Sequence, residues 1–468
     1  MTEQTFYWYD YEAFGLDPMT DRLTQFGGVR TDADFNIIGE PLMLYCKPSD
    51  EYLPNPASCL ITGITPQQAL ARGIPEIEFI RRINEEFSQP NTCVLGYNNL
   101  RFDDEFTRYT LYRNLLDPYA REWQNGCSRW DLLDVVRMTR ALRPEGIVWP
   151  TSPEGLPSVR LEDLTVANGI EHASAHDALS DVHATLAVAR LIREKQPKLF
   201  DFALQNRSKQ KVLQMLNLRD QRPVIHITGM YPAEKGNMAV VMPLAMHPVN
   251  KNGVIVYDLS VDPKDLIALG PKKIHERLFT RNDELPEGVA RIPLKVVHAN
   301  RCPVIAPITT LDGAAAKRYG IDLNVCRRNL EMIKHEKTLA QKVQKVFTES
   351  EFEPHTDPDH MLYGGPFFGD DDRAHMREIQ HMRPEELGTF EPRFSDKRLP
   401  EMLFRLRARN YPETLNEAER ERWRKFRYSR LKLDDYFAQI AQLRQEPGRG
   451  PRDQAILDEL EVYGRQLA

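Results

Sequence analysis

The amino-acid sequence predicts an α/β domain with a mixed sheet flanked by helices in residues 1–200, a small β-rich domain in 201–350 and an α-helical domain in 351–468. Its 468 residues exceed what a single hydrophobic core usually supports. The pattern of apolar residues changes after Pro197, and again across the acidic stretch 349–372, which contains prolines and glycines. Strands interleaved with helices before the first change, and helices alone after the second, predict this fold class.

The α/β domain opens with the run Phe6-Tyr-Trp-Tyr-Asp-Tyr-Glu12, whose aromatic composition favours a β-strand. We expect three further strands, at residues 24–30, 35–45 and 93–96. Apolar residues at three- and four-residue steps predict helices at 76–87, 103–115 and 178–192. The last helix is the clearest, because its apolar residues form one continuous stripe.

The middle part contains short strand-like runs separated by turn signals, which predict a small β domain such as a barrel. Its expected strands are 224–228, 238–242, 254–259 and 294–298, and a helix at 328–347 is expected to finish it. The C-terminal part is predicted to form a helical bundle. Its expected helices are 373–382, 399–408, 417–425, 433–445 and 454–466.

Composition excludes several classes of protein. A net charge of -6 argues against coating of nucleic acid by bulk positive charge, but allows a local basic groove. The six cysteines include no CxxC pair, which argues against a zinc ribbon and fits a reducing cytoplasm. The polar start does not resemble a signal peptide, and the longest apolar run, 238–246, is too short to span a bilayer. We therefore expect a soluble cytoplasmic protein with no membrane association.

Asp10 and Glu12 lie two residues apart on the first predicted strand, so both side chains point to one face of the sheet. Two carboxylates on one face repel each other and are costly to bury unless a cation neutralises them. Ligands that are all oxygen favour Mg²⁺ or Mn²⁺ over zinc. The alternative is that the two residues end a strand and face solvent, which is the better explanation for such a pair alone.

Asp103, His176 and Asp181 lie at the starts of two predicted helices. Each alone has a structural explanation: a favourable charge at a helix N-terminus for Asp103, and a surface position near the helix cap for His176. Together with Asp10 and Glu12 they fit phosphodiester hydrolysis. In that chemistry, carboxylates hold two cations about 3.5–4 Å apart, and a histidine takes the proton of the attacking water.

Three ordered motifs resemble the DEDD exonuclease superfamily with a catalytic histidine, on an RNase H-like fold. They are Asp10-Tyr-Glu12, Asn98-Asn-Leu-Arg-Phe-Asp103 and His176-Asp-Ala-Leu-Ser-Asp181. Further segments along the whole chain resemble the bacterial exonuclease I family. Among them are Leu60-Ile-Thr-Gly-Ile-Thr-Pro66, Arg129-Trp-Asp-Leu-Leu-Asp134 and Tyr363-Gly-Gly-Pro-Phe-Phe368.

The resemblance implies a processive enzyme of DNA repair and recombination, which degrades single-stranded DNA from the 3′ end and releases 5′-mononucleotides. It also implies that the middle domain is SH3-like. Asp10, Glu12 and Asp181 match the direct ligands of two Mg²⁺ ions, for which Mn²⁺ can substitute; Asp103 matches the fourth acidic residue, and His176 matches the general base. Two alternatives stay open at this point: an RNA exonuclease with the same site, and a non-catalytic scaffold that binds single strands.

A nuclease that ignores sequence should hold phosphates with basic residues and stack bases on aromatic rings. Besides Glu12, the candidates for substrate binding are Arg108, Tyr119, Trp123, Arg137, Arg160, Phe202 and Lys209. The strongest is Arg160, because family members place a phosphate-contacting arginine there. Tyr119 and Trp123, one helical turn apart, are more often a core pair than a stacking platform. Arg108 and Arg137 also suit solvated helix faces, and the basic run 327–345 is usually a solvated face, with the wall of a strand channel as the alternative.

The family resemblance also implies binding of the acidic C-terminal tail of single-stranded DNA-binding protein. By composition, Arg405, Arg407 and Arg409 are candidates for this contact, but they could instead pair with the acidic stretch 349–372. Nothing in the sequence indicates an obligate interface between copies of the chain, so we expect a monomer.

Overall fold

The computed structural model describes residues 3–172, 176–348 and 355–468. The chain forms two compact units. The first consists of Met1–Arg129, His172–Leu186 and Glu353–Ala468, and the second of Trp130–Glu171 and Ala187–Phe352. The C-terminal helices therefore belong to the same unit as the N-terminal strands. None of the helices in the described ranges is long and apolar enough to cross a membrane.

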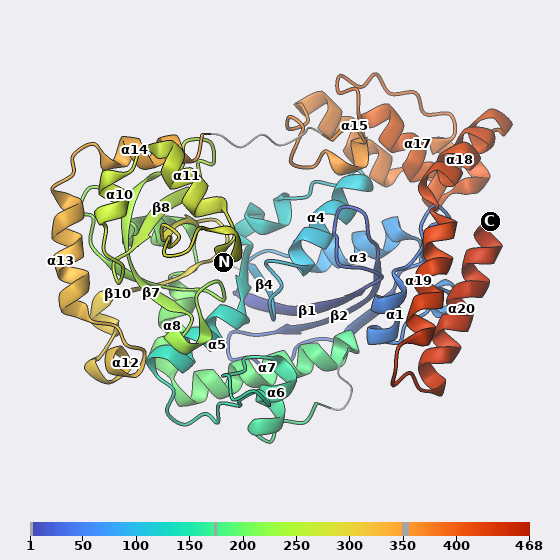
Figure 1. Cartoon of the computed structure of the whole chain (residues 1–468). Coiled ribbons are helices and arrows are strands. Elements are labelled where there is room, and N and C mark those ends of the chain that lie inside the picture. Colours follow the sequence, from blue (N-terminus) through green and yellow to red (C-terminus); the bar gives the residue numbers. More distant parts are fainter. Residues whose placement is uncertain (1–2, 173–175, 349–354) are drawn as a thin grey trace. The chain divides into compact units, whose positions relative to one another are not determined.

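The N-terminal part of the chain contains a five-stranded sheet in the order β3-β2-β1-β4-β5 (Figure 1). Its strands are β1 (Thr5–Ala13), β2 (Leu23–Thr31), β3 (Leu42–Tyr45), β4 (Thr92–Gly96) and β5 (Ser128–Asp131). The sheet is mixed, as predicted, because β1 pairs antiparallel with β2 but parallel with β4. Strand β1 alternates as its sequence requires: Tyr7, Tyr9 and Tyr11 enter a hydrophobic cluster with Phe26 and Phe87.

The helices of the first unit include the predicted helix Glu76–Phe87, whose apolar residues Ile77, Ile80 and Ile83 are buried. They are α1 (Pro56–Thr62), α2 (Pro66–Arg72), α3 (Glu76–Phe87), α4 (Asp103–Arg113), the first half of α7 (Ala178–Lys195), α15 (Asp370–His381), α16 (Pro384–Leu387), α17 (Leu399–Asn410), α18 (Glu417–Arg430), α19 (Leu433–Gln445) and α20 (Pro451–Leu467). Short 3-10 turns at Ala120–Glu122, Gln124–Gly126, Pro358–His360 and Pro412–Thr414 connect them.

The C-terminal helices share hydrophobic clusters with the N-terminal residues. Phe14 and Cys59 pack in one cluster with Tyr436 and Leu457, and α20 lies against α1 and α2 (Figure 1). A second cluster joins the α3 and α4 region to α15 and α17. Burying apolar side chains of both segments in common clusters makes each segment depend on the other for its stability.

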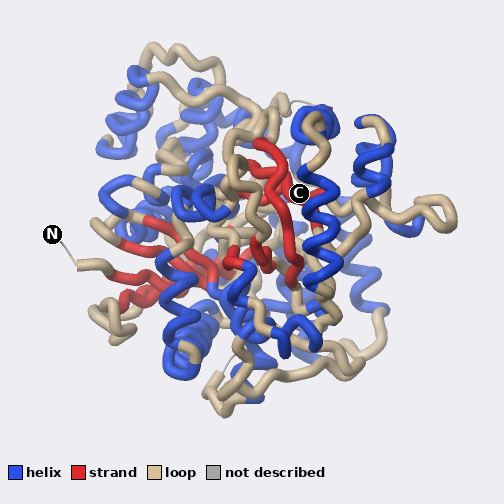
Figure 2. The backbone as a smooth tube through the Cα atoms, turned by 90° about the vertical axis from the view of Figure 1, so that its left-hand side faces the viewer, coloured by secondary structure: helices blue, strands red, loops and turns tan. Residues whose placement is uncertain are grey.

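The second unit contains a five-stranded antiparallel sheet in the order β10-β6-β7-β8-β9 (strands in red in Figure 2). Its strands are β6 (Val224–Ile227), β7 (Met238–Met246), β8 (Gly253–Asp258), β9 (Leu294–His298) and β10 (Val304–Pro307). Its helices are α5 (Leu132–Leu142), α6 (Leu161–Ala167), the second half of α7, α8 (Pro197–Gln205), α9 (Lys209–Met215), α10 (Lys264–Ala268), α11 (Pro271–Phe279), α12 (Gly313–Arg318), α13 (Leu323–Lys334) and α14 (Leu339–Val346), and its 3-10 turns are Ala233–Lys235, Asn282–Glu284 and Ile308–Thr310. This sheet confirms the predicted β-rich middle part.

Several predicted elements differ in extent from the structure. Strand β7 continues four residues beyond the expected 238–242, and helix α18 continues five residues beyond the expected 417–425. The strand expected at 35–45 shrinks to β3, which begins at Leu42. The Asp32 carboxylate accepts hydrogen bonds from the backbone of Asp34 and Asn36 and holds a turn at the start of this stretch, and Gly39, with a φ of 75°, interrupts the extended backbone after it. The helix expected at 328–347 is two helices, α13 and α14. Ile333 and Leu339 are six residues apart, which does not fit one face of a continuous helix, and the break allows both to be buried.

Candidate metal centre and active site

Strand β1 presents Asp10 and Glu12 on the face opposite its buried tyrosines. In the register with β2, Asp10 lies across from Gly27 and Glu12 across from Gln25. The Glu12 side chain is buried, and Asp10 is partly buried. The solvent-facing alternative for this pair is therefore wrong for Glu12, and both carboxylates carry the desolvation cost that the sequence indicated.

Asp103 is the first residue of α4 and is also buried. Its Oδ1 atom accepts a hydrogen bond of 3.2 Å from the backbone N–H of Tyr11, which lies between the two acidic residues of β1. The parallel pairing of β1 with β4 ends at Trp8 and Leu95, so Tyr11 lies beyond it. The start of α4 therefore lies beside β1 beyond the end of β4, and it places Asp103 near Asp10 and Glu12.

The first turn of α7 packs directly on β2 at Gly27. A Cβ atom at Gly27 would lie 2.5 Å from the backbone nitrogen of Leu179, so only glycine permits this approach. Asp181 lies one turn inside α7, and His176 precedes the helix with a positive φ of 66°. The close packing of α7 on the strand opposite Asp10 is what brings Asp181 to the carboxylates of β1.

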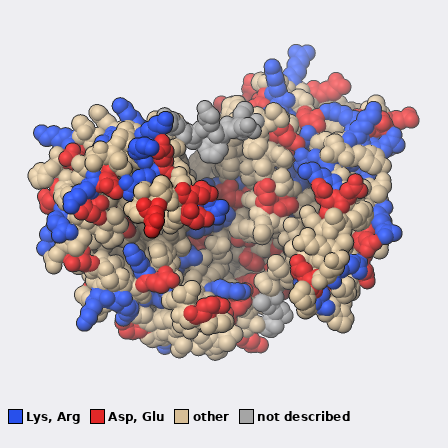
Figure 3. Space-filling model, viewed as in Figure 1, with Lys and Arg blue, Asp and Glu red and all other residues tan. Residues whose placement is uncertain are grey.

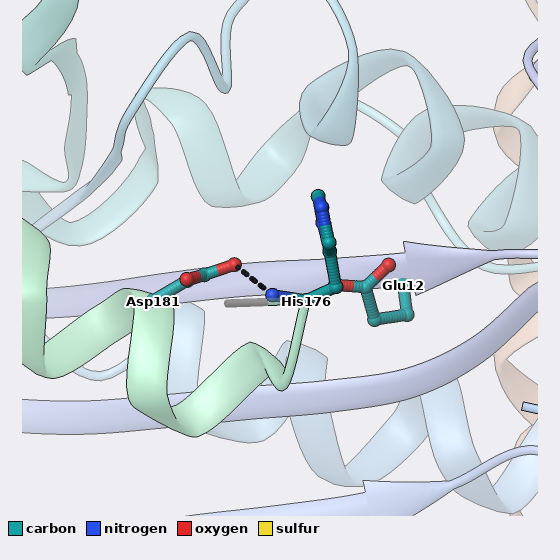
Figure 4. Close-up of side chains that lie close together, drawn as sticks. All are labelled: Glu12, His176 and Asp181. Carbon is teal, nitrogen blue, oxygen red and sulfur yellow. Dashed lines mark hydrogen bonds between the residues drawn. The ribbon is translucent and has the colours of Figure 1, made fainter. Parts of the chain in front are cut away.

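Glu12, His176 and Asp181 each offer a ligand atom, and these three atoms lie within 4.8 Å of one another. Figure 4 shows Glu12 on the strand, Asp181 on the helix and His176 in the segment between them. The dashed line marks the 3.3 Å hydrogen bond that the backbone N–H of His176 donates to Asp181 Oδ2. The fold thus brings Glu12 to two residues that follow it by 164 and 169 positions in the chain.

The carboxyl groups of this centre strongly favour protonation. Burial, followed by the charges of Asp181 and Asp103, raises the pKa of Glu12 from 4.5 to about 9. Burial and then Asp103 raise the pKa of Asp10 well above its usual value. Burial also raises the pKa of Asp181, although its hydrogen bond with His172 opposes that shift. A set of carboxylate oxygens that destabilise one another, with an imidazole beside them, fits a divalent cation.

The sequence provided no role for His172 in this centre. Its Nε2 atom lies 2.5 Å from Asp181 Oδ1, so it holds the carboxylate oxygen that does not face the His176 backbone. Only the spacing of nine residues from Asp181, across the start of a helix, could have pointed to this contact, and such a spacing has no regular structural meaning.

The strand-binding candidates of the first unit have different surroundings. Arg108 is buried, where its guanidinium pairs with Glu122 at 2.7 Å and Glu105 at 3.0 Å. Tyr119 packs beside it, with the Arg108 guanidinium 5.4 Å from the ring centre. Trp123 is 67% exposed. The expectation that Tyr119 and Trp123 lie one helical turn apart was wrong, because the chain there forms two 3-10 turns rather than an α-helix.

The candidates of the second unit also differ in their exposure to solvent. The Arg160 side chain is 72% exposed and lies 3.6 Å from Glu162. Lys209 begins α9 and is exposed, and Phe202 on α8 is half-buried. Arg137 on α5 instead pairs with Asp134 at 2.5 Å and is largely covered. Arg160 and Lys209 are therefore the charged side chains of this set that solvent reaches.

Basic residues do not coat the molecule. On the face drawn in Figure 3, Lys and Arg are interspersed with Asp and Glu, as the net charge implies. The predicted basic helix is divided between α13 and α14. Arg327 and Lys337 are exposed, and Lys342 donates to the backbone carbonyls of Leu266 and Ile267. These positions favour the solvated-face alternative for this segment.

The three arginines at 405, 407 and 409 form ion pairs within the first unit. Arg405 pairs with Asp357 at 2.5 Å, and Arg409 pairs with Asp359 at 2.6 Å and with Glu51 at 2.7 Å. Arg407 pairs with Glu419 at 2.8 Å. The suggestion that they receive an acidic peptide was wrong, because their side chains are buried against carboxylates of the chain itself. The alternative pairing with the stretch 349–372 is confirmed for Arg405 and Arg409.

Three family models together match most of the chain. Residues 7–189 match a family described as "Exonuclease", residues 207–349 match "Exonuclease I SH3-like domain", and residues 356–467 match "Exonuclease I C-terminal domain". The matched ranges follow the α/β, β-rich and helical order predicted from the sequence.

Individual relatives match over the full length. Exodeoxyribonuclease I of Escherichia coli (strain K12) is 46% identical, with 99% of this chain and 98% of the relative covered. Exonuclease I from Methylocaldum szegediense has a TM-score of 0.95 at 53% identity, with 99% of both chains covered. E. coli exonuclease I in complex with a dA16 oligonucleotide has a TM-score of 0.97 at 46% identity, with 100% of both chains covered. A zinc-bound form of the E. coli exonuclease I–ssDNA complex and SSB/exonuclease I with the inhibitor CFAM also match, at 45% and 44% identity.

Proposed function

The chain belongs to the exonuclease I family, and on that premise we propose that it degrades single-stranded DNA processively from the 3′ end, releasing 5′-mononucleotides in DNA repair and recombination. One observation carries the proposal: Glu12, His176 and Asp181 offer ligand atoms within 4.8 Å of one another. Asp10 and Asp103 lie close enough to interact electrostatically with this group, and Asp103 also accepts a hydrogen bond from the backbone of Tyr11. The E. coli relative bound to an oligonucleotide supports the choice of DNA over RNA.

We propose that Asp10, Glu12 and Asp181 hold Mg²⁺ directly, that Asp103 completes the site for a second ion, and that Mn²⁺ can substitute. Oxygen ligands suit these ions, although the E. coli relative has also been seen with zinc. When bound, the ions neutralise charge on the scissile phosphate and lower the pKa of water. The carboxylates must be deprotonated to bind them, so binding reverses the raised pKa values of Glu12 and Asp10.

His176 is proposed as the general base. It accepts a proton from the water that attacks the terminal phosphodiester, and the bond from phosphorus to the 3′-oxygen of the preceding nucleotide breaks. That 3′-oxygen takes up a proton from solvent and becomes the new 3′-hydroxyl end, and the phosphate stays on the 5′-oxygen of the released nucleotide. The positive φ of His176 and the hydrogen bond from its backbone to Asp181 hold the imidazole outside α7, next to Glu12. If this histidine lay inside α7, the helix geometry would instead set the direction of its side chain.

We propose that Arg160 and Lys209 contact strand phosphates, and that the exposed ring of Trp123 stacks on a base. Phe202 is proposed as a second stacking residue. Three further candidates are more buried, namely Arg108, Tyr119 and Arg137. We expect them to support the residues that contact the strand, and not to contact the strand themselves. Glu12, as a metal ligand, also contacts the terminal phosphate through the metal.

The partner and the compartment are proposed on similar grounds. The SSB/exonuclease I structure supports binding of single-stranded DNA-binding protein through its acidic tail. Because Arg405, Arg407 and Arg409 are engaged in buried ion pairs, we expect this contact at another surface of the protein. We propose a monomeric cytoplasmic enzyme, a location that suits the buried thiols of Cys46 and Cys59.

The decisive experiment is a time course of digestion of 3′- and 5′-labelled single strands in Mg²⁺ or EDTA. We expect immediate loss of the 3′ label as a mononucleotide, progressive shortening of the 5′-labelled strand, and no reaction in EDTA. A matched RNA strand should survive. Release from the 5′ end, equal digestion of RNA, or full activity in the Asp181→Ala variant would reject the proposal.

Processivity needs a different test from removal of residues 351–468, because those helices share hydrophobic clusters with the N-terminal strands. The intact enzyme should be bound to a long labelled strand without metal, then started with Mg²⁺ together with excess unlabelled strand. We expect bound molecules to continue to the end of the labelled strand. Arrest after one or a few nucleotides would show a distributive enzyme.

A further inference from the structure

Gln25 is a buried amide that lies across from Glu12 in the register of β1 and β2. Its side chain reaches the first turn of α7, 152 residues away in the sequence. Oε1 accepts a 3.2 Å hydrogen bond from the backbone N–H of Ala178, and Nε2 donates a 3.0 Å hydrogen bond to Asp177 Oδ2. Nε2 also donates to the Tyr45 hydroxyl at 2.9 Å.

These partners determine the orientation of the amide. The N–H of Ala178 can only donate, so Oε1 must face it and Nε2 must face Asp177. Both hydrogens of Nε2 then have acceptors, in Asp177 and Tyr45. A glutamate would present a second carboxylate to Asp177, an apolar residue would leave the Ala178 N–H without this acceptor, and an asparagine is one methylene shorter.

The residues that Gln25 grips lie between the two functional side chains of this segment. Asp177 directly follows His176, and its Oδ1 accepts from the backbone N–H of Ser180 in the first turn of α7. Its backbone carbonyl accepts from the N–H of Asp181. Displacement of Asp177 would therefore move His176 and Asp181 together, relative to Glu12 on the neighbouring strand.

We propose that Gln25 is a positioning residue for the nuclease centre. Its amide clamps Asp177 and Ala178 to β2, at the strand position opposite Glu12, and so holds His176 and Asp181 at a fixed distance from the carboxylates of β1. Gly27, two residues along the same strand, provides the close backbone approach that allows this grip. The inference rests on the proposed nuclease function but concerns a residue outside the proposed metal ligands and strand contacts.

The test uses an exchange of donor and acceptor. Gln25→Glu removes the donor of the hydrogen bond between the two side chains. Asp177→Asn leaves a single acceptor oxygen for two donors, Gln25 Nε2 and the backbone N–H of Ser180. In the double variant the carboxylate introduced on β2 can accept from the amide introduced before α7, while the oxygen of that amide still accepts from Ser180 and the total charge is unchanged. Variants should be assayed for kcat and KM on single-stranded DNA, for strand affinity in EDTA, and for Mn²⁺ affinity without DNA.

We expect each single variant to lower kcat by about 10- to 100-fold and to weaken Mn²⁺ binding by a similar factor, the range typical of residues that orient metal ligands. KM and strand affinity in EDTA should stay within about twofold, and the double variant should recover at least half of the loss on a logarithmic scale. Tyr45→Phe is the control: it removes the other acceptor of Nε2 and should leave kcat within about twofold.

Unchanged kcat and Mn²⁺ affinity in both single variants would overturn the proposal. So would equal losses in the single and double variants, because a general loss of packing is not restored by exchanging two polar groups. If the wild-type chain proved to lack nuclease activity, the Mn²⁺ titrations would still decide whether Gln25 positions the metal ligands. Failure of this inference is thus distinguishable from failure of the proposed function.

Discussion

Asp103 and Asp104 are adjacent in the sequence and both are buried, yet they interact with different sets of charges. Asp104 lies 2.7 Å from Arg121 and 2.5 Å from Arg129, and these charges hold its pKa well below the usual value despite burial. Asp103 faces Asp10 and Glu12 and raises the pKa of both. The protein therefore treats two neighbouring carboxylates in contrasting ways.

The same contrast extends to two groups of carboxylates. Glu51 and Asp359, which join the N-terminal strands to the C-terminal helices, share Arg409 as a buried partner, and the pKa of Glu51 falls to about 2, with the opposing arginines outweighing burial. The groups at the nuclease centre are destabilised chiefly by burial and by one another. Where the fold must be held together, the chain provides arginine, whereas at the centre it concentrates negative charge that a divalent cation can neutralise.

The largest expected effect comes from Asp10→Asn. Removing a carboxylate that holds metal should lower kcat by about 10³-fold or more, because the metal ligands act as a unit and the loss of one disables the site. The same change relieves repulsion at the centre, so the melting temperature in EDTA should rise. Digestion assays and thermal melts measure the two effects. A variant that keeps its activity, or that melts at a lower temperature in EDTA, would contradict the claim that the carboxylates of the nuclease centre bind metal and repel one another.

The matching substitution Asp104→Asn should act in the opposite direction on stability. It leaves Arg121 buried without its principal counter-charge, which costs about 3–5 kcal/mol of unfolding free energy. Denaturant unfolding in EDTA measures the change, with Asp10→Asn as the matched control. If both variants shifted stability in the same direction, the two environments would not be opposite in the way the pKa directions indicate.

The pH dependence should also differ between the two groups. The folded pKa of Glu12 is about 9 against an ordinary 4.5, so its folded form binds the proton more tightly and stability in EDTA should fall as pH rises from about 5 to 9. Glu51 behaves oppositely: with a folded pKa of about 2, its stabilisation should be lost as pH falls below about 4.5.

Melting curves at pH 3, 6 and 9, with EDTA or Mg²⁺, test this pair of slopes. Because metal binding requires deprotonated carboxylates, Mg²⁺ should raise the melting temperature more at pH 9 than at pH 6. The Glu12→Gln variant is the control, since it should flatten the slope between pH 6 and 9 in EDTA. A wild-type melting temperature that does not change over that interval would oppose the predicted shift.

The smallest effect is expected from exposed arginine, in contrast to the buried arginines of the structural pairs. Arg160→Ala should weaken strand binding by about 1 kcal/mol and lower the slope of log affinity against log salt by about 0.7, as expected for one phosphate contact on a single strand. Fluorescence anisotropy in EDTA measures both. Arg281→Ala, at another exposed arginine, is the control and should change neither quantity.

Much of the fold was predictable because local periodicity carried it. The alternation in β1 and the apolar faces of α3 and α7 are properties of short segments. The wrong predictions for β3 and for the helix at 328–347 depended on local interruptions. The turn held by Asp32 and the positive φ of Gly39 precede β3, and the phase change between Ile333 and Leu339 divides one predicted helix into two. Boundaries of this kind depend on side-chain contacts that residue composition does not reveal.

The sequence by itself determined which residue types were available for the centre and on which elements they lie. Two-residue spacing put Asp10 and Glu12 on one strand face, and the motif order put Asp103, His176 and Asp181 at helix starts. Only the tertiary structure decided which carboxylates meet arginine and which meet one another. Residue type and local pattern do not separate Asp103 from Asp104, and only the motif that ends at Asp103 singled it out. Their different surroundings follow from the packing of α4 against β1 and Arg121. The reason is physical: the energy of a buried charge depends on the charges and dipoles around it in space, and these come from distant parts of the chain.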